Sequence, residues 1–267
     1  VRYALSIALD RDYIASIVGA GAEAATGIIP STIFETTSGT SFRKKGNGVL
    51  SSSAQFDEAK QILKDAGINP MAYDDIYLYY RSDETNDSYA SSALGFNSKE
   101  KAIATYVREV WNKLGFNVVL RASNAKVYED ALKNGDYDVI GLDYQMLSAY
   151  AIYDLAAFAT QYSGSVDTSV QTEDAYKAVP GITGYSSAEY DALIDEAFAA
   201  TNKKEKAAIL HNAEEVLLKD GAIVPIVYNC DCYVVSKSIS GLEKTFYGAK
   251  IFTKVSLKDY EKYLQTT

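Results

Sequence analysis

The sequence has few of the side chains that most catalytic and metal sites use. Its 267 residues include one histidine, His211, and two cysteines, Cys230 and Cys232. A Ser-His-Asp or Cys-His triad requires a base, and His211 lies in a stretch whose apolar spacing predicts an amphipathic helix. One histidine and a Cys-x-Cys pair also fall short of the usual zinc ligand set, and a disulfide between positions i and i+2 would be strained. We expect no catalytic residues, no metal and no cofactor.

Cationic residues and long apolar runs are scarce as well. The chain has 26 Lys and Arg against 35 Asp and Glu, which gives a net charge of -9. Such a chain repels phosphate backbones, so nucleic acid is not an expected partner. Its apolar runs, such as Leu155 to Ala159, are far shorter than the roughly 18 residues that cross a bilayer. With 48% apolar residues, the composition is that of a packed globular protein.

A helix followed by a strand recurs three times in the middle of the chain. Apolar spacing, capping residues and β-branched runs predict helices over 54–66, 98–114 (with Ser98 as N-cap) and 127–133, followed by strands over 76–80, 116–120 and 137–142. Successive units of this kind imply crossover connections between parallel strands. The predicted fold class is therefore α/β, with a largely parallel sheet covered by helices.

The flanking segments give further predictions. Helices are expected over 1–18, ended by Gly19, over 150–162, and over 187–200 and 203–219, with Ser186 and Glu189 as a capping box. The polar stretch 31–53 is typical of a surface loop, and 163–184 is irregular. The apolar run 222–228 predicts a buried strand in which Pro225 marks an edge, bulge or hinge.

The candidate binding residues follow the last strand of the predicted sheet. Asp143 comes directly after Leu142, which ends that strand, and Tyr144 and Gln145 come next. Open α/β sheets place their ligand crevice at the carboxyl ends of the strands, so these four residues are candidates for a ligand site. An ordinary strand-end turn explains the same pattern equally well.

Two other acidic residues suggest an enzymatic alternative. Asp191 and Asp195 are four residues apart, on one face of a predicted helix. A hydrolase could use either as an acid or base. A solvated helix face is the simpler interpretation, because the spacing is not diagnostic of catalysis.

Four segments together resemble the extracytoplasmic solute-binding proteins of ABC importers, in the peptide and nickel class. They are residues 1–11 with 25–30, residues 56–67, the Gly-Asp-Tyr-Asp turn 135–138, and residues 185–197 continued by 213–217 and 223–226. The resemblance is to the C-terminal half of that family. It implies a type II periplasmic-binding-protein lobe over 1–228 (lobe II), followed by a segment over 229–267 that crosses the hinge and belongs largely to lobe I.

The resemblance also implies a function. Such a protein is a monomeric receptor that captures oligopeptides outside the cytoplasmic membrane and delivers them to an ABC permease, without chemistry. It implies that Asp143 holds the α-ammonium group of the peptide. The chain begins at Val1, with neither Met nor signal peptide, so we expect a longer lipoprotein tethered through an absent N-terminal region. The alternative is a receptor for oligosaccharide or another small solute, with Tyr144, Tyr150 and Tyr153 as stacking platforms.

Overall fold

The chain was analysed as a computed structural model, which describes residues 1–37, 40–44, 48–82, 96–162, 183–230, 233–245 and 249–259. It divides into two units, Val1–Tyr228 and Asn229–Thr267. Most of the stretch 163–184, expected to be irregular, lies outside the described residues. Among the helices that are described, none combines the length and the apolar character that a membrane span requires.

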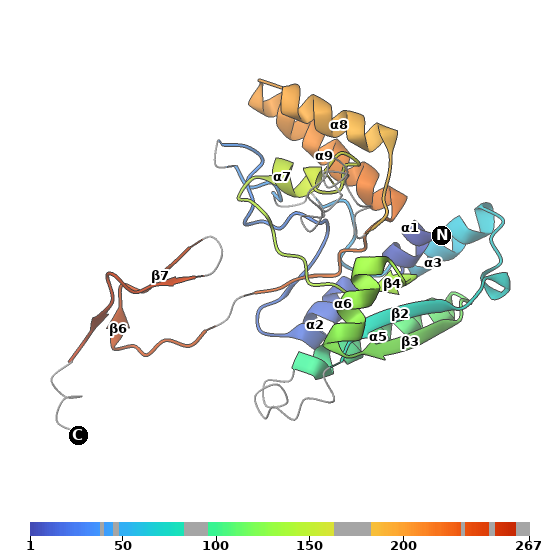
Figure 1. The fold of residues 1–267 in the computed structure, drawn as a ribbon, viewed down its shortest axis with the longest axis horizontal. Helices are drawn as coiled ribbons and strands as arrows, with labels where there is room; N and C mark the ends of the chain where they lie inside the picture. The colour runs from blue at the N-terminus through green and yellow to red at the C-terminus, as the bar shows by residue number, and fades with distance from the viewer. Residues whose placement is uncertain are drawn as a thin grey trace, which may run out of the picture. The chain divides into compact units, whose positions relative to one another are not determined.

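The first unit contains a three-stranded parallel sheet (Figure 1). Its strands, in spatial order, are β3 (Val118–Ser123), β2 (Ile76–Arg81) and β4 (Val139–Ile140). Helices α5 (Phe96–Lys113) and α6 (Ala125–Asn134) connect these strands in the sequence and pack against β2 and β3. The predicted α/β class with a parallel sheet is confirmed. Helix α5 begins before Ser98, so Ser98 is not its N-cap, and β4 is shorter than predicted.

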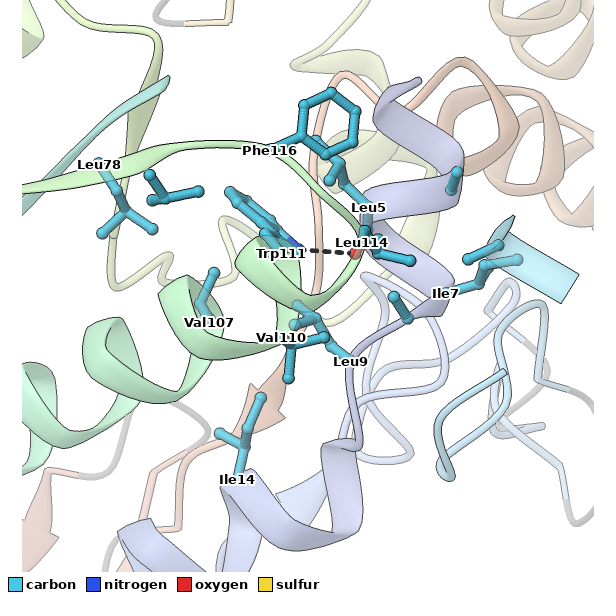
Figure 2. Packing of buried hydrophobic residues seen from close by; sticks show 14 of the residues in the cluster. Leu5, Ile7, Leu9, Ile14, Leu78, Val107, Val110, Trp111, Leu114 and Phe116 are labelled. Carbon is cyan, nitrogen blue, oxygen red and sulfur yellow. Dashed lines mark hydrogen bonds between the residues drawn. The ribbon is translucent and has the colours of Figure 1, made fainter. Parts of the chain in front are cut away.

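The first apolar core lies between the sheet, α5 and the N-terminal helices (Figure 2). These helices are α1 (Arg2–Ile7), α2 (Arg11–Val18) and α3 (Phe56–Asp65); a 3-10 turn, η1 (Pro70–Ala72), precedes β2. Trp111 of α5 is buried among them, and its indole N–H donates a hydrogen bond to the carbonyl of Leu5 at 2.9 Å. This bond satisfies the one polar atom of a large buried ring, so Trp111 ties α5 to α1.

The predicted helix over 1–18 is two helices, because Asp10 interrupts it. The backbone of Asp10 is extended (φ −85°, ψ 103°), and its carboxylate accepts a hydrogen bond from the N–H of Tyr13 at 2.8 Å. It is therefore the N-cap of α2. The apolar spacing continues through the break because Leu9 is buried in the same core. Gly19 (φ 65°) ends α2 as predicted.

Arg11 is a fully buried cation that joins α2 to the end of the first unit. Its Nε donates to the carbonyl of Pro225 at 2.9 Å, and its other nitrogens donate to the carbonyls of Leu9 and Ser51 and to Ser6 Oγ. Burial lowers the pKa of Arg11 to about 10, which leaves it charged at neutral pH. Among the described residues its hydrogen-bond partners are carbonyls and a hydroxyl, and because these hold the charge in place of a carboxylate, the surrounding backbone must keep one arrangement.

The predicted strand over 222–228 forms only at its end. Its last two residues are β5 (Val227–Tyr228), which pairs antiparallel with β1 (Glu23–Ala24). Residues 222–228 are half-buried, not covered on both faces. Pro225 contributes its carbonyl to Arg11 in place of a strand hydrogen bond.

A second apolar core lies among three helices: α7 (Ala151–Ala156), α8 (Ala188–Ala199) and α9 (Lys203–Asp220). Helices α8 and α9 lie side by side (Figure 1), and α7 packs against both. Ser187, not Ser186, caps α8 by accepting from the N–H of Tyr190. The predicted capping box is therefore wrong, because Glu189 lies two residues after the N-cap and Tyr190 takes the third position. The helix predicted over 150–162 is confirmed only over α7, and turns follow it.

The stretch 31–53 is not merely a surface loop. Ile33 and Phe42 are fully buried in the second core, and Leu50 is buried in the first. Arg43 is also buried, and it forms an ion pair with Glu214 of α9. Polar residues dominate the sequence here, and the few apolar ones enter the two cores.

Glu214 holds the segment that precedes this stretch. Its Oε1 accepts hydrogen bonds from the N–H groups of Ile28 and Ile29, at 2.9 and 3.1 Å, and from Arg43. Arg43 Nε in turn donates to the Ile29 carbonyl at 3.2 Å. A Cβ on Gly27 would collide with the side chains of Arg43 and Glu214. The Gly-Ile-Ile-Pro segment therefore depends on a buried ion pair and on a glycine beside it.

The second unit contains two antiparallel two-stranded ladders. They pair β6 (Ile239–Ser240) with β9 (Ser256–Leu257), and β7 (Glu243–Lys244) with β8 (Lys250–Ile251). None of the described residues between 229 and 259 is buried. Two-stranded ladders without an apolar core are marginally stable in water.

We predict that Glu214→Ala lowers the free energy of unfolding by about 3–5 kcal/mol, because it leaves a buried, uncompensated Arg43. Urea denaturation of the chain measures this change. Glu215→Ala is the matched control: Glu215 forms an exposed ion pair with Lys219, which solvent screens, so little change is expected. Equal effects of the two substitutions would contradict the role given to the buried pair.

Candidate functional site

The carboxyl ends of the three parallel strands meet at one edge of the sheet. Strand β2 ends at Arg81 and β3 at Ser123, and the Ser82 N–H donates to the Ser123 carbonyl at 2.8 Å. The Gly141 N–H donates to the Tyr79 carbonyl at 2.9 Å, which places the start of the β4–α7 loop at this edge. Here the β4–α7 loop means residues 141–150. The edge is where an open α/β sheet positions a ligand.

The four predicted ligand residues are exposed in this loop. Leu142 and Tyr144 keep 46% and 38% of their surface, and Asp143 and Gln145 are also exposed. Asp143 is therefore accessible at the strand end rather than enclosed in a core. The placement agrees with the predicted site, and the ligand role of the four residues stays a prediction.

Charged groups of both signs act on Tyr128, which contacts the loop that carries Asp143. Tyr128 of α6 donates its hydroxyl hydrogen to the Gly141 carbonyl at 2.5 Å, which anchors the loop where it leaves β4. Burial raises the pKa of Tyr128, the negative charges of Glu100 and Asp143 raise it further, and the positive charge of Arg81 opposes them. The side chains from β2, α5, α6 and the loop thus share one electrostatic environment at this edge.

The other end of the loop packs on the second core. The ring of Tyr144 lies 5.8 Å from that of Phe158, and burial raises the pKa of Tyr144 to about 12, with Asp154 adding to the effect. Phe34 exchanges backbone hydrogen bonds with Ala149 and Ala151, at 2.9 and 3.0 Å. The loop therefore runs from the sheet to α7 and is fixed at both ends.

Sequence reasoning missed Asp154, the buried acid beneath this loop. Its Oδ1 accepts a hydrogen bond from the Leu147 N–H at 2.5 Å. A signal existed in the sequence: Asp154 is the only charged residue in the apolar run 151–159. An acid at such a position is either exposed on one helix face or buried with a specific partner.

The tyrosines considered as stacking platforms do not form one cluster. Tyr144 packs against Phe158, whereas Tyr153 is exposed and its ring lies 6.3 Å from that of Phe198 on α8. Tyr150 precedes α7 as its N-cap and is half-buried. Only Tyr144 belongs to the group of predicted ligand residues.

The groups considered for catalysis have structural partners. His211 stacks on Phe42, with ring centroids 4.0 Å apart, and its Nε2 lies 3.1 Å from Glu35 Oε1. Asp191 accepts from the Thr160 N–H at 2.8 Å, and Asp195 accepts from the amide of Gln161 at 2.9 Å. Within the described part of the chain, no group of three or more His, Cys, Asp or Glu residues is placed to hold a metal.

A shallow recess of about 480 Å³ lies elsewhere on the unit, along α9. It is lined by Gly48, Val49, Ala208, His211, Asn212, Glu215 and Lys219. None of the four predicted ligand residues lines it.

Comparison of the structure with known ones shows the class of fold. The structure of OppA from Haemophilus influenzae in complex with RPPGFSPFR superposes with a TM-score of 0.62 at 21% identity, over 90% of this chain and 41% of that one. The chain has the α/β fold of the type II periplasmic binding proteins.

Sequence comparison shows the family. The family model for bacterial extracellular solute-binding proteins, family 5 Middle, matches residues 1–165, and the chain belongs to this family. The oligopeptide-binding protein OppA of Bacillus subtilis is 26% identical over 246 residues, which are 91% of this chain and 39% of that protein. The probable deoxycholate-binding periplasmic protein YgiS of Escherichia coli is 27% identical over 232 residues, 85% of this chain and 36% of that protein.

The Gly-Asp-Tyr-Asp turn has one structural carboxylate. Asp138 accepts a hydrogen bond from the Tyr77 N–H at 2.9 Å and so joins the start of β4 to β2. Asp136, two residues earlier, is exposed, and its side chain forms no hydrogen bond or ion pair with the other described residues. The turn therefore sets the register of the strand that leads to Asp143.

We predict that Asp138→Ala lowers the free energy of unfolding by about 1 kcal/mol, because the Tyr77 N–H loses its acceptor. Asp138→Asn keeps an acceptor oxygen and should restore most of the loss, and Asp136→Ala is the matched control. Chemical denaturation of the three variants measures the changes. A cost for Asp136→Ala as large as that for Asp138→Ala would show that charge, not this bond, is responsible.

Proposed function

We propose that this chain is the C-terminal portion of a solute receptor that captures oligopeptides outside the cytoplasmic membrane and delivers them to an ABC permease. The observation that carries the proposal is the position of an exposed carboxylate, Asp143, at the carboxyl edge of a parallel sheet in a family-5 chain. The chain spans 39% of the length of the Bacillus relative, whose name describes oligopeptide binding. The receptor binds and releases its ligand without breaking a bond in it.

The proposed receptor has two lobes, of which residues 1–228 form lobe II. Residues 229–267 cross the hinge and belong largely to lobe I, most of which lies outside this sequence. Two observations support this division. The chain separates into two units after Tyr228, and none of the described residues of the second unit is buried. A segment of that kind is expected to pack against a partner in the whole protein. The receptor is a monomer, tethered to the membrane as a lipoprotein through an N-terminal region.

Asp143 is proposed to hold the α-ammonium group of the peptide. Its carboxylate is accessible, and closure of a second lobe over it would remove water from the pair. Leu142, Tyr144 and Gln145 would line the adjacent part of the site, with one apolar, one aromatic and one amide side chain. A site of this kind fixes the register of the bound peptide through the charged terminus of the peptide and selects only weakly among peptide side chains.

The second candidate is the same receptor role for an oligosaccharide or another small solute. The name of the Escherichia coli relative describes binding of deoxycholate, a ligand without an ammonium group. The exposed rings of Tyr144 and Tyr153 provide apolar faces for a sugar or sterol.

We predict that Asp143→Ala in the full-length receptor weakens binding of an oligopeptide by roughly 2 kcal/mol or more, because the ammonium loses its partner. Isothermal calorimetry with a free and an N-acetylated peptide tests the pairing. Acetylation should weaken wild-type binding and change the variant little, because the two changes remove the same interaction. Asp195→Ala, an exposed carboxylate on α8, is the control.

Independent losses from acetylation and from Asp143→Ala would contradict the ammonium role. The 267-residue chain alone should show no measurable peptide binding, since one wall of the enclosure is outside it. Micromolar binding by this chain would contradict the two-lobed site.

We predict that oligopeptides, rather than oligosaccharides or deoxycholate, stabilise the full-length receptor against heat. A ligand at 100 times its dissociation constant adds about 2.7 kcal/mol to the free energy of unfolding. Thermal melting with each of the three ligand classes makes the comparison. A shift with oligosaccharide or deoxycholate alone would favour the second candidate.

A further inference from the structure

The buried carboxylate of Asp154 lies on α7, directly beneath the β4–α7 loop. It is 1% exposed, and its Oδ1 accepts from the Leu147 N–H at 2.5 Å. Among the residues that the structure describes, its Oδ2 has no hydrogen-bond partner. The Ser148 N–H is close enough to favour the charged form, without the geometry of a hydrogen bond.

The surroundings of Asp154 are apolar, so a charge there is costly. Its neighbours on α7, Ala151, Ile152 and Leu155, are all buried in the second core. A buried charge costs free energy unless it is paired or hydrogen-bonded, a cost that an apolar residue of similar size would not carry. Core packing alone therefore does not account for an acid at this position. What distinguishes it is the backbone that it bonds.

That backbone belongs to the loop with the predicted ligand residues. Leu147 comes two residues after Gln145, and the Tyr144 ring packs on Phe158, just beyond α7. Asp154 also raises the pKa of Tyr144, which places its charge near that hydroxyl. The segment 144–147 is thus held against α7 by a ring contact at one end and by Asp154 at the other.

We propose that Asp154 is a positioning residue for ligand recognition: its carboxylate, bonded to the Leu147 N–H, fixes the β4–α7 loop so that Asp143, Tyr144 and Gln145 face the ligand. This inference rests on the proposed function. Asp154 does not touch the ligand; it acts through the loop backbone. Removing the acceptor leaves a loop that must be ordered when the ligand binds, and affinity falls by that cost.

The ionisation of Asp154 gives a second readout. Burial raises its pKa to about 6, while the Leu147 and Ser148 N–H groups oppose the shift. The carboxylate is charged at pH 7.5 and protonated at pH 5, where its bond to the Leu147 N–H is weaker. The pKa of Asp154 is higher in the folded chain than in the unfolded chain. Its contribution to the free energy of unfolding therefore rises as the pH falls through about 6. Ligand affinity and stability therefore change in opposite directions.

Other titratable groups lie on the elements that pack against α7. They include Tyr144 in the loop, Tyr190 and Asp191 on α8, and His211 and Glu214 on α9. Tyr190 donates to the Leu155 carbonyl at 2.6 Å, and burial raises its pKa well above its usual value. All of these groups are present in Asp154 variants too, so a comparison of variant with wild type isolates Asp154.

The test measures peptide affinity of the full-length receptor by calorimetry at pH 7.5 and pH 5. Asp154→Ala should weaken binding about tenfold at pH 7.5, the equivalent of one lost hydrogen bond to a charged group. Asp154→Asn keeps an acceptor and should lose about threefold or less. Asp191→Ala is the matched control, because it removes a carboxylate bonded to the Thr160 N–H, away from the loop.

The pH comparison keeps the test valid if Asp154→Ala fails to fold. Wild-type affinity should fall more between pH 7.5 and pH 5 than that of Asp154→Asn, and wild type should gain thermal stability relative to Asp154→Asn over the same interval. Equal pH profiles for the two proteins, or equal affinity losses in Asp154→Ala and Asp191→Ala, would overturn the inference. If Asp143→Ala weakens binding and Asp154→Ala does not, only the positioning role fails. If neither matters, the proposed peptide site fails.

Discussion

Hydrogen bonds between buried charged side chains and irregular backbone hold the first unit in one arrangement. The three side chains concerned, Arg11, Glu214 and Asp154, bond to backbone at Pro225, at Ile28 and Ile29, and at Leu147. None of these partners lies in a helix or strand, so no ladder or helical turn would satisfy them. A buried charge is tolerated only with such bonds, and each therefore fixes the path of a segment that secondary structure does not.

The candidate site depends on regular secondary structure and on a loop that tertiary contacts hold in place. The parallel sheet brings the ends of its three strands to one edge, and this places Asp143 near Tyr128 of α6. The β4–α7 loop then leaves the sheet and joins the second core, where α7 supplies its support. A loop fixed at both ends loses little conformational freedom when a ligand binds, which suits the receptor role proposed for this chain.

Local sequence signals predicted most of the regular elements. The α/β class, the parallel sheet and helices α3, α6, α8 and α9 follow from apolar spacing, and glycines at the ends of α2 and α9 adopt positive φ. The sequence predictions were wrong where two local signals disagree, such as apolar spacing and a capping residue. Apolar spacing ran through Asp10, whose capping bond splits the first helix. The polar composition of 31–53 predicted a surface loop, although a few of its apolar residues are buried in the two cores.

The sequence by itself determined the family, the order of elements and the strand end at which Asp143 lies, because these depend on residue spacing along the chain. It did not reveal that Glu214 meets Ile28 or that Asp154 supports the loop it follows. Those contacts depend on how two cores pack, and burial gives the same acidic side chain a different role from the one it has in solvent. Only the tertiary structure decided which of the 35 acidic residues are buried and what they bond.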